Sequence, residues 1–380
     1  MPVGALVDLE VDRSTVLPAW ALPAEPVVST EGLTRFVAAI LRDAGIARAD
    51  AALAAEVFVL ADRRGHPSHG VSRLRQYLRL IESGSVNAAA RPRPIVRRAA
   101  LELWDGDRAL GPAVAHRAMA RAIARARRTG LAAVVVRGGG HFGIAGAYAM
   151  RAMAAGMVGI ATSNGSPIVP PTGAKAPAIG TNPLAIGIPD GTGRGFLLDM
   201  ATSVVAGGKV EVAARQGKPI PMGWALGPDG EPTTDAPTAL RGMMLPLGGL
   251  AETSGYKGYG LAAAIDLLTG VLSGGAYGLS VAGMWDTGHP TSIGQLLIAL
   301  DPAAFGEPER FFRRTLEWRA EITGRPRQAG VDEILVAGDK EWRAQDRQTA
   351  RVTLVPEVVA DLAALAAERG LLRAWRGAVR

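Results

Sequence analysis

A glycine-rich turn that carries a histidine limits the folds open to this chain. The apolar run Leu131–Val136 leads into Gly138, Gly140 and Gly143, which have the G-x-G-x-x-G spacing of dinucleotide-binding Rossmann folds. That motif also needs an Asp or Glu about 20 residues further on to hold the ribose. No acidic residue occurs from Arg108 through Pro189. We therefore expect a fold other than the doubly wound parallel sheet.

Proton-carrying side chains gather in two short polar segments. Three of the five histidines, His66, His69 and His141, lie in these segments. Arg73 follows His69 by four positions and Tyr77 follows by four more, so all three lie along one helical face. Histidine titrates in the physiological range, and arginine can grip a carboxylate with two parallel hydrogen bonds. The pattern predicts a proton carrier beside a carboxylate clamp, the minimum for oxidising a 2-hydroxy acid.

Composition excludes several classes of protein. The chain has 380 residues, of which 48% are hydrophobic and 20% charged, as in a folded globular protein with a sizeable core. It contains no cysteine, so disulfides and thiolate metal sites are excluded. His66 and His69 lack an acidic partner nearby, and we expect no metal site.

The formal charge of +7 raises the alternative of a nucleic-acid-binding protein. The densest basic segment is residues 117–128, in which arginines alternate with alanine and isoleucine at helical spacing. We interpret it as the solvated face of an amphipathic helix, because no zinc pattern, recognition helix or stacking motif accompanies it. Nucleic-acid binding therefore stays a distant alternative, and no nucleic-acid partner is expected.

We also expect no membrane association and a cytoplasmic location. The first residues contain Asp8, Glu10 and Asp12 and do not resemble a signal peptide. The longest apolar stretch, Leu261–Gly283, contains Asp266 and several glycines. It predicts a buried helix and loop rather than a membrane span.

The order of elements predicts helices at both ends of the chain and a mixed region between them. Residues 1–27 are rich in proline and aperiodic, which indicates an extended arm. Long structured loops such as 165–183 are usually functional. Helical spacing is found at 30–44, 50–64, 71–83, 257–272, 307–322 and after Pro356, and strand patterns at 131–136, 158–162, 184–188, 196–198 and 331–336.

From about residue 28 to residue 375, the chain resembles the type 2 malate/L-lactate dehydrogenases. This family also includes sulfolactate and ureidoglycolate dehydrogenases and reductases of cyclic imines such as Δ1-piperideine-2-carboxylate. The resemblance rests on many ordered motifs: Ser68-His69-Gly70 with Arg73 and Tyr77, His141-Phe142-Gly143, Gly180-Thr181-Asn182-Pro183, Leu198-Asp199-Met200-Ala201-Thr202-Ser203, Gly208-Lys209, Leu245-Pro246-Leu247-Gly248-Gly249 and Gly255-Tyr256-Lys257-Gly258-Tyr259-Gly260.

The resemblance implies a mixed α/β fold that is not a Rossmann fold, with a largely antiparallel sheet and helical N- and C-terminal segments. It also implies a homodimer or a higher homo-oligomer. We expect an arm at 1–27 and a helical domain, 28–95 plus 301–380, that contributes active-site and cofactor contacts. Residues 96–300 would form a mixed α/β domain for the nicotinamide cofactor and the substrate.

The resemblance further implies an NAD- or NADP-dependent oxidoreductase acting on a small anionic 2-hydroxy or 2-keto acid. Ser68 and His69 would form a proton relay, with His141 as a second acid–base group. Arg73 and Tyr77 would bind the substrate carboxylate or the cofactor phosphates. The expected cofactor contacts are His141, Phe142, Gly143, Ile144, Ala145, Leu198, Asp199, Met200, Lys257, Gly258, Gly338 and Asp339.

Several alternatives stay open at this point. The same proton carrier would serve an NADPH-dependent reductase of a cyclic imino acid, Δ1-piperideine-2-carboxylate or Δ1-pyrroline-2-carboxylate. The choice between NAD and NADP is not fixed. Ser68 also suits a helix N-cap, a role compatible with a relay. Asp199 follows a predicted strand and would equally suit a helix cap.

Overall fold

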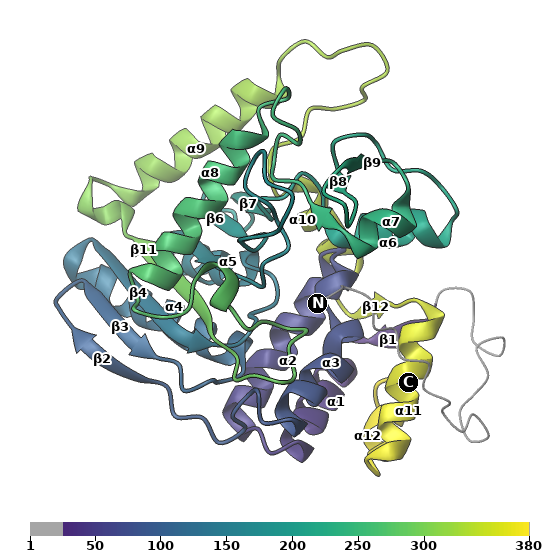
Figure 1. Cartoon of the computed structure of the whole chain (residues 1–380). Coiled ribbons are helices and arrows are strands. Elements are labelled where there is room, and N and C mark those ends of the chain that lie inside the picture. The colour runs from purple at the N-terminus through teal and green to yellow at the C-terminus, as the bar shows by residue number, and fades with distance from the viewer. Residues whose placement is uncertain (1–25, 380) are drawn as a thin grey trace.

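The computed structural model of this protein describes residues 26–379, and its central element is a seven-stranded sheet (Figure 1). The order is β2-β3-β4-β11-β5-β6-β7, and every neighbouring pair is antiparallel except β3–β4. This confirms the expected non-Rossmann, largely antiparallel fold. The strands are β2 (Arg93–Arg97), β3 (Leu101–Asp105), β4 (Leu131–Gly139), β5 (Val158–Ser163), β6 (Leu184–Ile188), β7 (Phe196–Met200) and β11 (Ile293–Leu300).

The sheet is built around β11, although this strand is remote in sequence from its neighbours. It pairs with both β4 and β5, and most of its side chains are buried, as expected of a central strand. Two alanine-rich helices, α4 (Gly111–Thr129) and α5 (Gly146–Ala154), pack against these strands. Their small side chains allow close contact with the sheet, and Gly159 of β5 has no room for a Cβ because Ala149 and Ala152 lie against it.

The two ends of the chain share one hydrophobic core. It joins α1 (Thr30–Asp43), α2 (Arg48–Arg63) and α3 (Leu74–Glu82) to α11 (Pro356–Glu368) and α12 (Leu372–Arg376). A short antiparallel ribbon of β1 (Val27–Ser29) and β12 (Arg351–Thr353) ties them together (Figure 1). The expected arm at 1–27 lies outside the described residues except for its last two, and Val27 already belongs to β1.

A smaller lobe lies beside the main sheet on the right of Figure 1. It has its own apolar core and consists of α6 (Gly207–Arg215), β8 (Ala225–Leu226), β9 (Pro232–Thr233), α7 (Ala236–Arg241) and β10 (Met243–Met244). The remaining helices are α8 (Gly255–Asp266), which continues as a π-helix (Leu267–Val271), α9 (Pro308–Thr323) and α10 (Asp339–Arg347). In Figure 1, α8 passes in front of the sheet.

Two sequence predictions about individual elements are wrong. Residues 331–336 form no strand, because the segment runs along the surface without a partner strand and Val331 is exposed. The predicted helix within 261–283 forms as α8 and the π-helix, but it is buried on one side only. Ala262 and Ile265 are buried, whereas the described residues leave several other apolar side chains exposed. Exposed fractions reach 57% at Leu267 and 64% at Leu272. Among the described residues, no helix is both long and apolar enough to cross a bilayer.

The arginines of α4 serve the fold. Arg121 and Arg125 both donate to the buried carboxylate of Glu102 on β3, over 2.8 Å and 2.7 Å, and Trp104 donates to its other oxygen. Arg117 pairs with Asp50 of α2. The opposite face of α4 is buried alanine, methionine and isoleucine, so the interpretation as an amphipathic helix is confirmed.

Glu102→Gln should lower the free energy of unfolding by about 3 kcal/mol, because it leaves two arginines without their shared anion. This value is at the low end of the free-energy cost of breaking a buried ion pair, because both arginine guanidinium groups reach the surface. Urea unfolding measures the change. Glu321→Gln, at an exposed pair with Arg325, is the control and should cost under about 1 kcal/mol. Equal losses in the two variants would contradict this role of Glu102.

Candidate active site

Two consecutive 3-10 turns carry the first group of predicted site residues. α2 ends at Arg63, and the turns Pro67–His69 and Val71–Arg73 meet at Gly70 before α3 begins. The proline starts the first turn, where a missing N–H is tolerated. The prediction of continuous helix from 71 is therefore correct only from Leu74 onward, and the tighter winding sets the directions of His69 and Arg73.

Ser68, His69 and Arg73 are joined by hydrogen bonds within these turns. The hydroxyl Oγ of Ser68 lies 2.9 Å from Nδ1 of His69, which is the contact that a relay requires. Nε of Arg73 donates to the carbonyl oxygen of Ser68 over 2.7 Å. The guanidinium carbon of Arg73 also lies 5.2 Å from the centre of the Trp285 ring, within cation–π range.

His141 lies on the loop after β4, and this loop is fixed by buried polar contacts. Gln295 of β11 donates to the carbonyl of Gly140, and Thr291 donates to that of Gly139. The start of α4 packs so closely that a Cβ on Gly111 would lie 2.1 Å from the carbonyl oxygen of His141. The close approach of α4 therefore fixes the backbone of the loop at His141.

Tyr77 of α3 connects the turns that carry Ser68, His69 and Arg73 to the loop that carries His141. Its hydroxyl lies 2.6 Å from Nδ1 of His141, and the rings of His69 and His141 stack with centroids 5.8 Å apart. Tyr77 is 1% exposed and packs on Phe58. Its contact in the structure is therefore with His141, and its predicted contact with the substrate stays a prediction.

The hydrogen bonds assign the proton of His141. The backbone N–H of Gly143 donates to Nδ1 over 3.3 Å, so Nδ1 is an acceptor. Burial raises the pKa of Tyr77 well above its usual value, which keeps the phenol protonated and able to donate to the same nitrogen. A neutral imidazole with Nδ1 accepting carries its proton on Nε2. His141 thus presents an N–H donor at Nε2. For His69 the rotatable Ser68 hydroxyl permits either tautomer.

Both histidines are neutral in the free protein. Burial lowers the pKa of His141 to about 3, helped by the nearby His69 and Arg73. Burial likewise lowers the pKa of His69 to about 4, with further contributions from Arg73 and His66. A neutral His69 is able to accept a proton. An anionic substrate placed beside it would raise its pKa, because an opposite charge favours the protonated form.

Two of the predicted cofactor segments lie side by side. The backbone N–H of Leu197, on β7, donates to the carbonyl of Ala337 over 3.0 Å, which places Leu198–Met200 next to Gly338. Asp199 accepts the N–H of Gly146 in the first turn of α5. The alternative that it caps a helix directly after its strand is wrong, because the next helix, α6, begins only at Gly207. Burial raises the pKa of Asp199, and nearby His66 and the Gly146 amide oppose that rise.

The side chains of other predicted cofactor residues make contacts within the protein. The side chains of Phe142, Ile144 and Ala145 belong to the hydrophobic core, so this segment would offer a ligand its backbone and His141. The Asp339 carboxylate accepts from Val336 and pairs with Arg319 at 2.5 Å.

At the start of α8 only one of the two predicted cofactor residues is open to solvent. Lys257 is exposed on the first turn, whereas Gly258 packs against the backbone of Leu247. No hydrogen bond or ion pair of the described chain joins Lys257 to the histidines.

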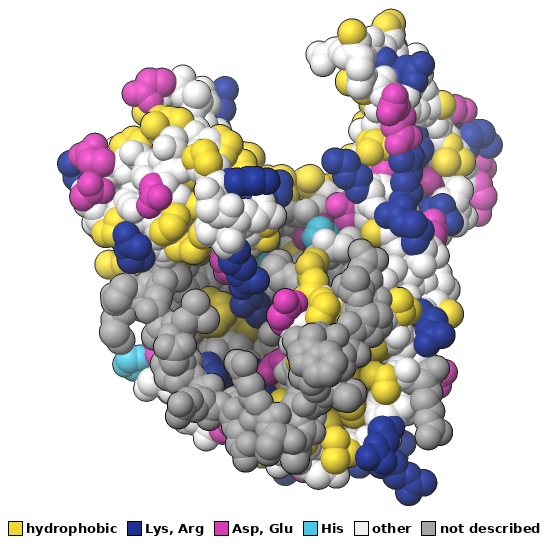
Figure 2. All heavy atoms as spheres, turned by 90° about the vertical axis from the view of Figure 1, so that its right-hand side faces the viewer, with side chains coloured by type: hydrophobic (Ala, Val, Ile, Leu, Met, Phe, Trp, Pro, Cys, Tyr) yellow, Lys and Arg dark blue, Asp and Glu magenta, His cyan; other side chains and the backbone are white. Residues whose placement is uncertain are grey.

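Three features of the structure fit a dinucleotide. Arg64 is 2% exposed and its Nε has no hydrogen-bond partner, and neither has the buried Nε2 of His66, beside Asp199. A cavity of about 490 Å³ between α9 and α10 is lined by Arg319, Arg325, Arg327 and Arg343 and by the acidic Asp332, Glu333 and Asp339, and Arg319 and Arg343 are paired with two of these carboxylates. Figure 2 shows a hollow between two raised parts of the surface, with basic side chains along its walls.

Sequence reasoning missed two residues that contact this site. Trp285 reaches Arg73 from a loop that gave no signal in the sequence. Asp62 contacts the turn after His69, and a signal for it existed: it continues the buried helical series Ala51, Ala55 and Phe58 with a charged side chain. Within residues 26–379, no three acidic or histidine side chains are arranged to hold a metal ion.

Comparison with known proteins agrees with this geometry. The malate/L-lactate dehydrogenase family model matches residues 28–363. Malate dehydrogenase of Pyrococcus horikoshii is 39% identical over 315 residues, which cover 82% of this chain and 87% of the relative. The sulfolactate dehydrogenase structure from Methanocaldococcus jannaschii has a TM-score of 0.83 at 35% identity and covers 91% of this chain and 98% of that one.

A third similar structure is Δ1-piperideine-2-carboxylate reductase from Pseudomonas syringae, with a TM-score of 0.79 at 30% identity, covering 90% of this chain and 99% of that one. The fold, the facing histidines and these matches together define the chain as an oxidoreductase. It belongs to the malate/L-lactate dehydrogenase family.

The neutral histidines predict how stability changes in acid. A histidine whose folded pKa lies below its unfolded value of about 6.5 makes the protein less stable as pH falls from 6.5 toward that folded pKa. His141→Gln should therefore flatten the stability–pH slope between about pH 6.5 and 4.5, by about 1.4 kcal/mol per pH unit. Urea unfolding at several pH values measures the slope. Asp62, whose pKa burial raises to about 7, contributes equally in both proteins. Identical slopes would mean that His141 is charged in the folded state.

Proposed function

We propose that this protein transfers a hydride between a nicotinamide cofactor and a small 2-hydroxy or 2-keto acid. The observation that carries the proposal is the facing pair His69 and His141, stacked at 5.8 Å beside the guanidinium of Arg73. Such a group can exchange a proton with a hydroxyl while the arginine holds the neighbouring carboxylate. The relatives' names, which include malate, sulfolactate and ureidoglycolate dehydrogenases, support this substrate class.

In this proposal His69 carries the proton. It is neutral, so Nε2 accepts the proton of the substrate hydroxyl while Nδ1–H faces the oxygen of Ser68. The Ser68 hydroxyl rotates and lets Nδ1 exchange its proton with solvent. The bound nicotinamide supplies the hydride chemistry at its C4 atom.

His141 and Arg73 orient the substrate. Nε2–H of His141 donates a hydrogen bond to the substrate oxygen and stabilises the charge that develops there, whereas Tyr77 and Gly143 hold its ring from the other side. Arg73 has five N–H donors, and Nε is committed to Ser68, so the Nη groups face the carboxylate.

A second candidate is the reduction of a cyclic imino acid. The structural match to a Δ1-piperideine-2-carboxylate reductase favours it, and the same His69 would protonate the ring nitrogen. We propose NAD or NADP as the cofactor, bound along His141–Ala145, Leu198–Met200, Lys257–Gly258 and Gly338–Asp339. Relatives are named for each: an NADP+-linked sulfolactate dehydrogenase of Chromohalobacter salexigens and an NAD+-linked ureidoglycolate dehydrogenase of Escherichia coli.

A homodimer is the proposed assembly, formed through the face of α8 and the π-helix that the described residues leave exposed. Seven large apolar side chains lie within one short stretch and are 36–75% exposed: Leu261, Leu267, Leu268, Val271, Leu272, Tyr277 and Leu279. A patch of this kind marks an interface in most proteins.

We also propose that the chain divides into a helical part (28–95 plus 301–380) and a mixed part (96–300). A cytoplasmic location is proposed as well. The absence of cysteine fits a reducing compartment.

His69→Ala should lower kcat by about 10²- to 10⁴-fold, the usual contribution of general acid–base catalysis, while cofactor affinity changes little. The assay follows NADH and NADPH oxidation with a panel of 2-keto acids and cyclic imino acids. Cofactor-dependent thermal stabilisation, measured on the same preparations, gives affinity and folding. If neither dinucleotide raises the melting temperature of the wild-type protein, the proposed function is wrong. A folded His69→Ala enzyme with normal kcat would move the proton transfer to His141.

Leu268→Glu should convert the protein to a monomer, because it places a charge in the centre of the apolar face. Light scattering after size-exclusion chromatography measures the mass. Leu372→Glu, at an exposed leucine of α12, is the matched control and should leave the dimer intact. A wild-type protein that runs as a 39.4 kDa monomer would refute the interface.

A further inference from the structure

The turn that carries Ser68, His69 and Arg73 depends on one internal contact that the proposed reaction does not use. Gly70 has an extended conformation, with φ −89° and ψ −151°, between two 3-10 turns. Directly beneath it lies Asp62, on the last turn of α2. Side chains on both sides of Gly70 belong to the site, so any shift at this residue moves them relative to His141.

Asp62 contacts the Gly70–Val71 segment at two points. Its Oδ2 accepts the backbone N–H of Val71 over 2.8 Å. Its carboxyl group also covers the Cα of Gly70, where a Cβ would lie 2.1 Å from Oδ1 and 2.3 Å from Oδ2. Only glycine fits against the carboxyl group at this distance. The aspartate and the glycine therefore form a matched pair.

The surroundings of Asp62 give it no other role. It is 5% exposed, and no ion pair among the described residues involves it. The adjacent arginines point to α10 and its C-terminal turn: Arg63 donates to the carbonyl of Gln348 and Arg64 to Gln345. Burial raises the pKa of Asp62 to about 7, partly opposed by the Val71 N–H. A buried carboxyl without a cation destabilises a fold, and the clamp on the turn is the contact that offsets this.

We propose that Asp62 is a positioning residue, whose carboxyl clamps the Gly70–Val71 turn and thereby holds Ser68 and His69 toward His141. The proposal rests on the proposed dehydrogenase function for its catalytic consequence. Displacing a reacting group by about 1 Å can lower a rate by 10²-fold, so loss of this clamp affects turnover without any contact between Asp62 and the substrate.

Two substitutions of Asp62 distinguish a role of its carboxyl group in holding the turn from a role in packing alone. Asp62→Ala removes the acceptor and should lower kcat by about 10-fold or more at saturating cofactor and substrate. Asp62→Asn keeps an acceptor oxygen of the same shape and should retain kcat within about 3-fold, a rescue that a charge requirement would not permit. Cofactor affinity, measured by thermal shift, should be unchanged in both.

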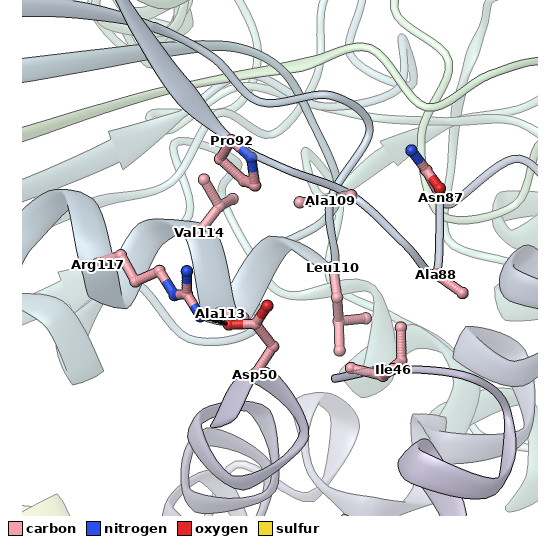
Figure 3. A pocket seen from close by; sticks show the side chains of 11 residues that line it. Ile46, Asp50, Asn87, Ala88, Pro92, Ala109, Leu110, Ala113, Val114 and Arg117 are labelled. Carbon is pink, nitrogen blue, oxygen red and sulfur yellow. Dashed lines mark ion pairs between the residues drawn. The ribbon is translucent and has the colours of Figure 1, made fainter. Parts of the chain in front are cut away.

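Asp50→Asn is the matched control on the same helix. Asp50 pairs with Arg117 of α4 beside a small cavity of about 10 Å³ (Figure 3). Its loss should lower the melting temperature and leave kcat unchanged. If Asp50→Asn lowers kcat as much as Asp62→Ala does, the effect is general destabilisation and the proposal fails.

Gly70→Ala tests the matched pair directly. Alone it forces a Cβ into the Asp62 carboxyl and should lower kcat. Added to Asp62→Ala, where that space is empty, it should have a much smaller effect, so the two changes are not additive. Additive losses would contradict the contact.

Hydrogen exchange gives a readout that does not need activity. Peptides covering residues 66–73 should exchange faster in Asp62→Ala than in wild type, and at the wild-type rate in Asp62→Asn. Wild-type exchange and wild-type kcat in a folded Asp62→Ala protein would overturn the proposal. If no variant, wild type included, turns over any substrate while exchange changes as expected, the clamp stands and the proposed function fails.

Discussion

The hydrogen bond between the Tyr77 hydroxyl and Nδ1 of His141 is the contact on which the rest of the site depends. Tyr77 belongs to the helical part of the chain, and His141 follows a strand of the main sheet, so this 2.6 Å bond joins the two. Together with the Gly143 N–H it fixes the His141 proton on Nε2. One histidine then faces the substrate as a donor, and the other, next to a rotatable hydroxyl, is left to carry the proton.

Local elements of the fold were predictable, and its assembly was not. Helical and strand spacing placed α1, α2, β4 and β5 within a few residues, because these patterns depend on neighbours in sequence. The central place of β11 depends on pairing with remote strands, which no local pattern encodes. Residues 331–336 had strand composition without a partner strand. The run 261–283 was correctly read as apolar, but apolarity does not say whether the same chain or a second one covers it.

For the site as well, some features could be predicted from the sequence and others could not. His69 and His141 could be found because a proton carrier in a glycine-rich segment has little structural use. The direction of the Tyr77 hydroxyl, the capping of α5 by Asp199 and the clamp by Asp62 are contacts between segments far apart in sequence. Of these contacts, only that of Asp62 had a signal in the sequence, namely a charged residue at a buried helical position. The missing acidic residue after the glycine turn excluded the Rossmann fold but did not identify the sheet that replaces it.

The most direct test of this account is the protonation state of His141, measured by nuclear magnetic resonance on protein labelled with nitrogen-15 in its histidines. A neutral ring with the proton on Nε2 is expected, unchanged as pH falls from 8 to 5, because burial lowers the pKa of His141 to about 3. In Tyr77→Phe the preference for this tautomer should weaken, because only the Gly143 N–H then donates to Nδ1. A His141 ring that titrates near its ordinary pKa of about 6.5, or that carries its proton on Nδ1 in the wild-type protein, would contradict it.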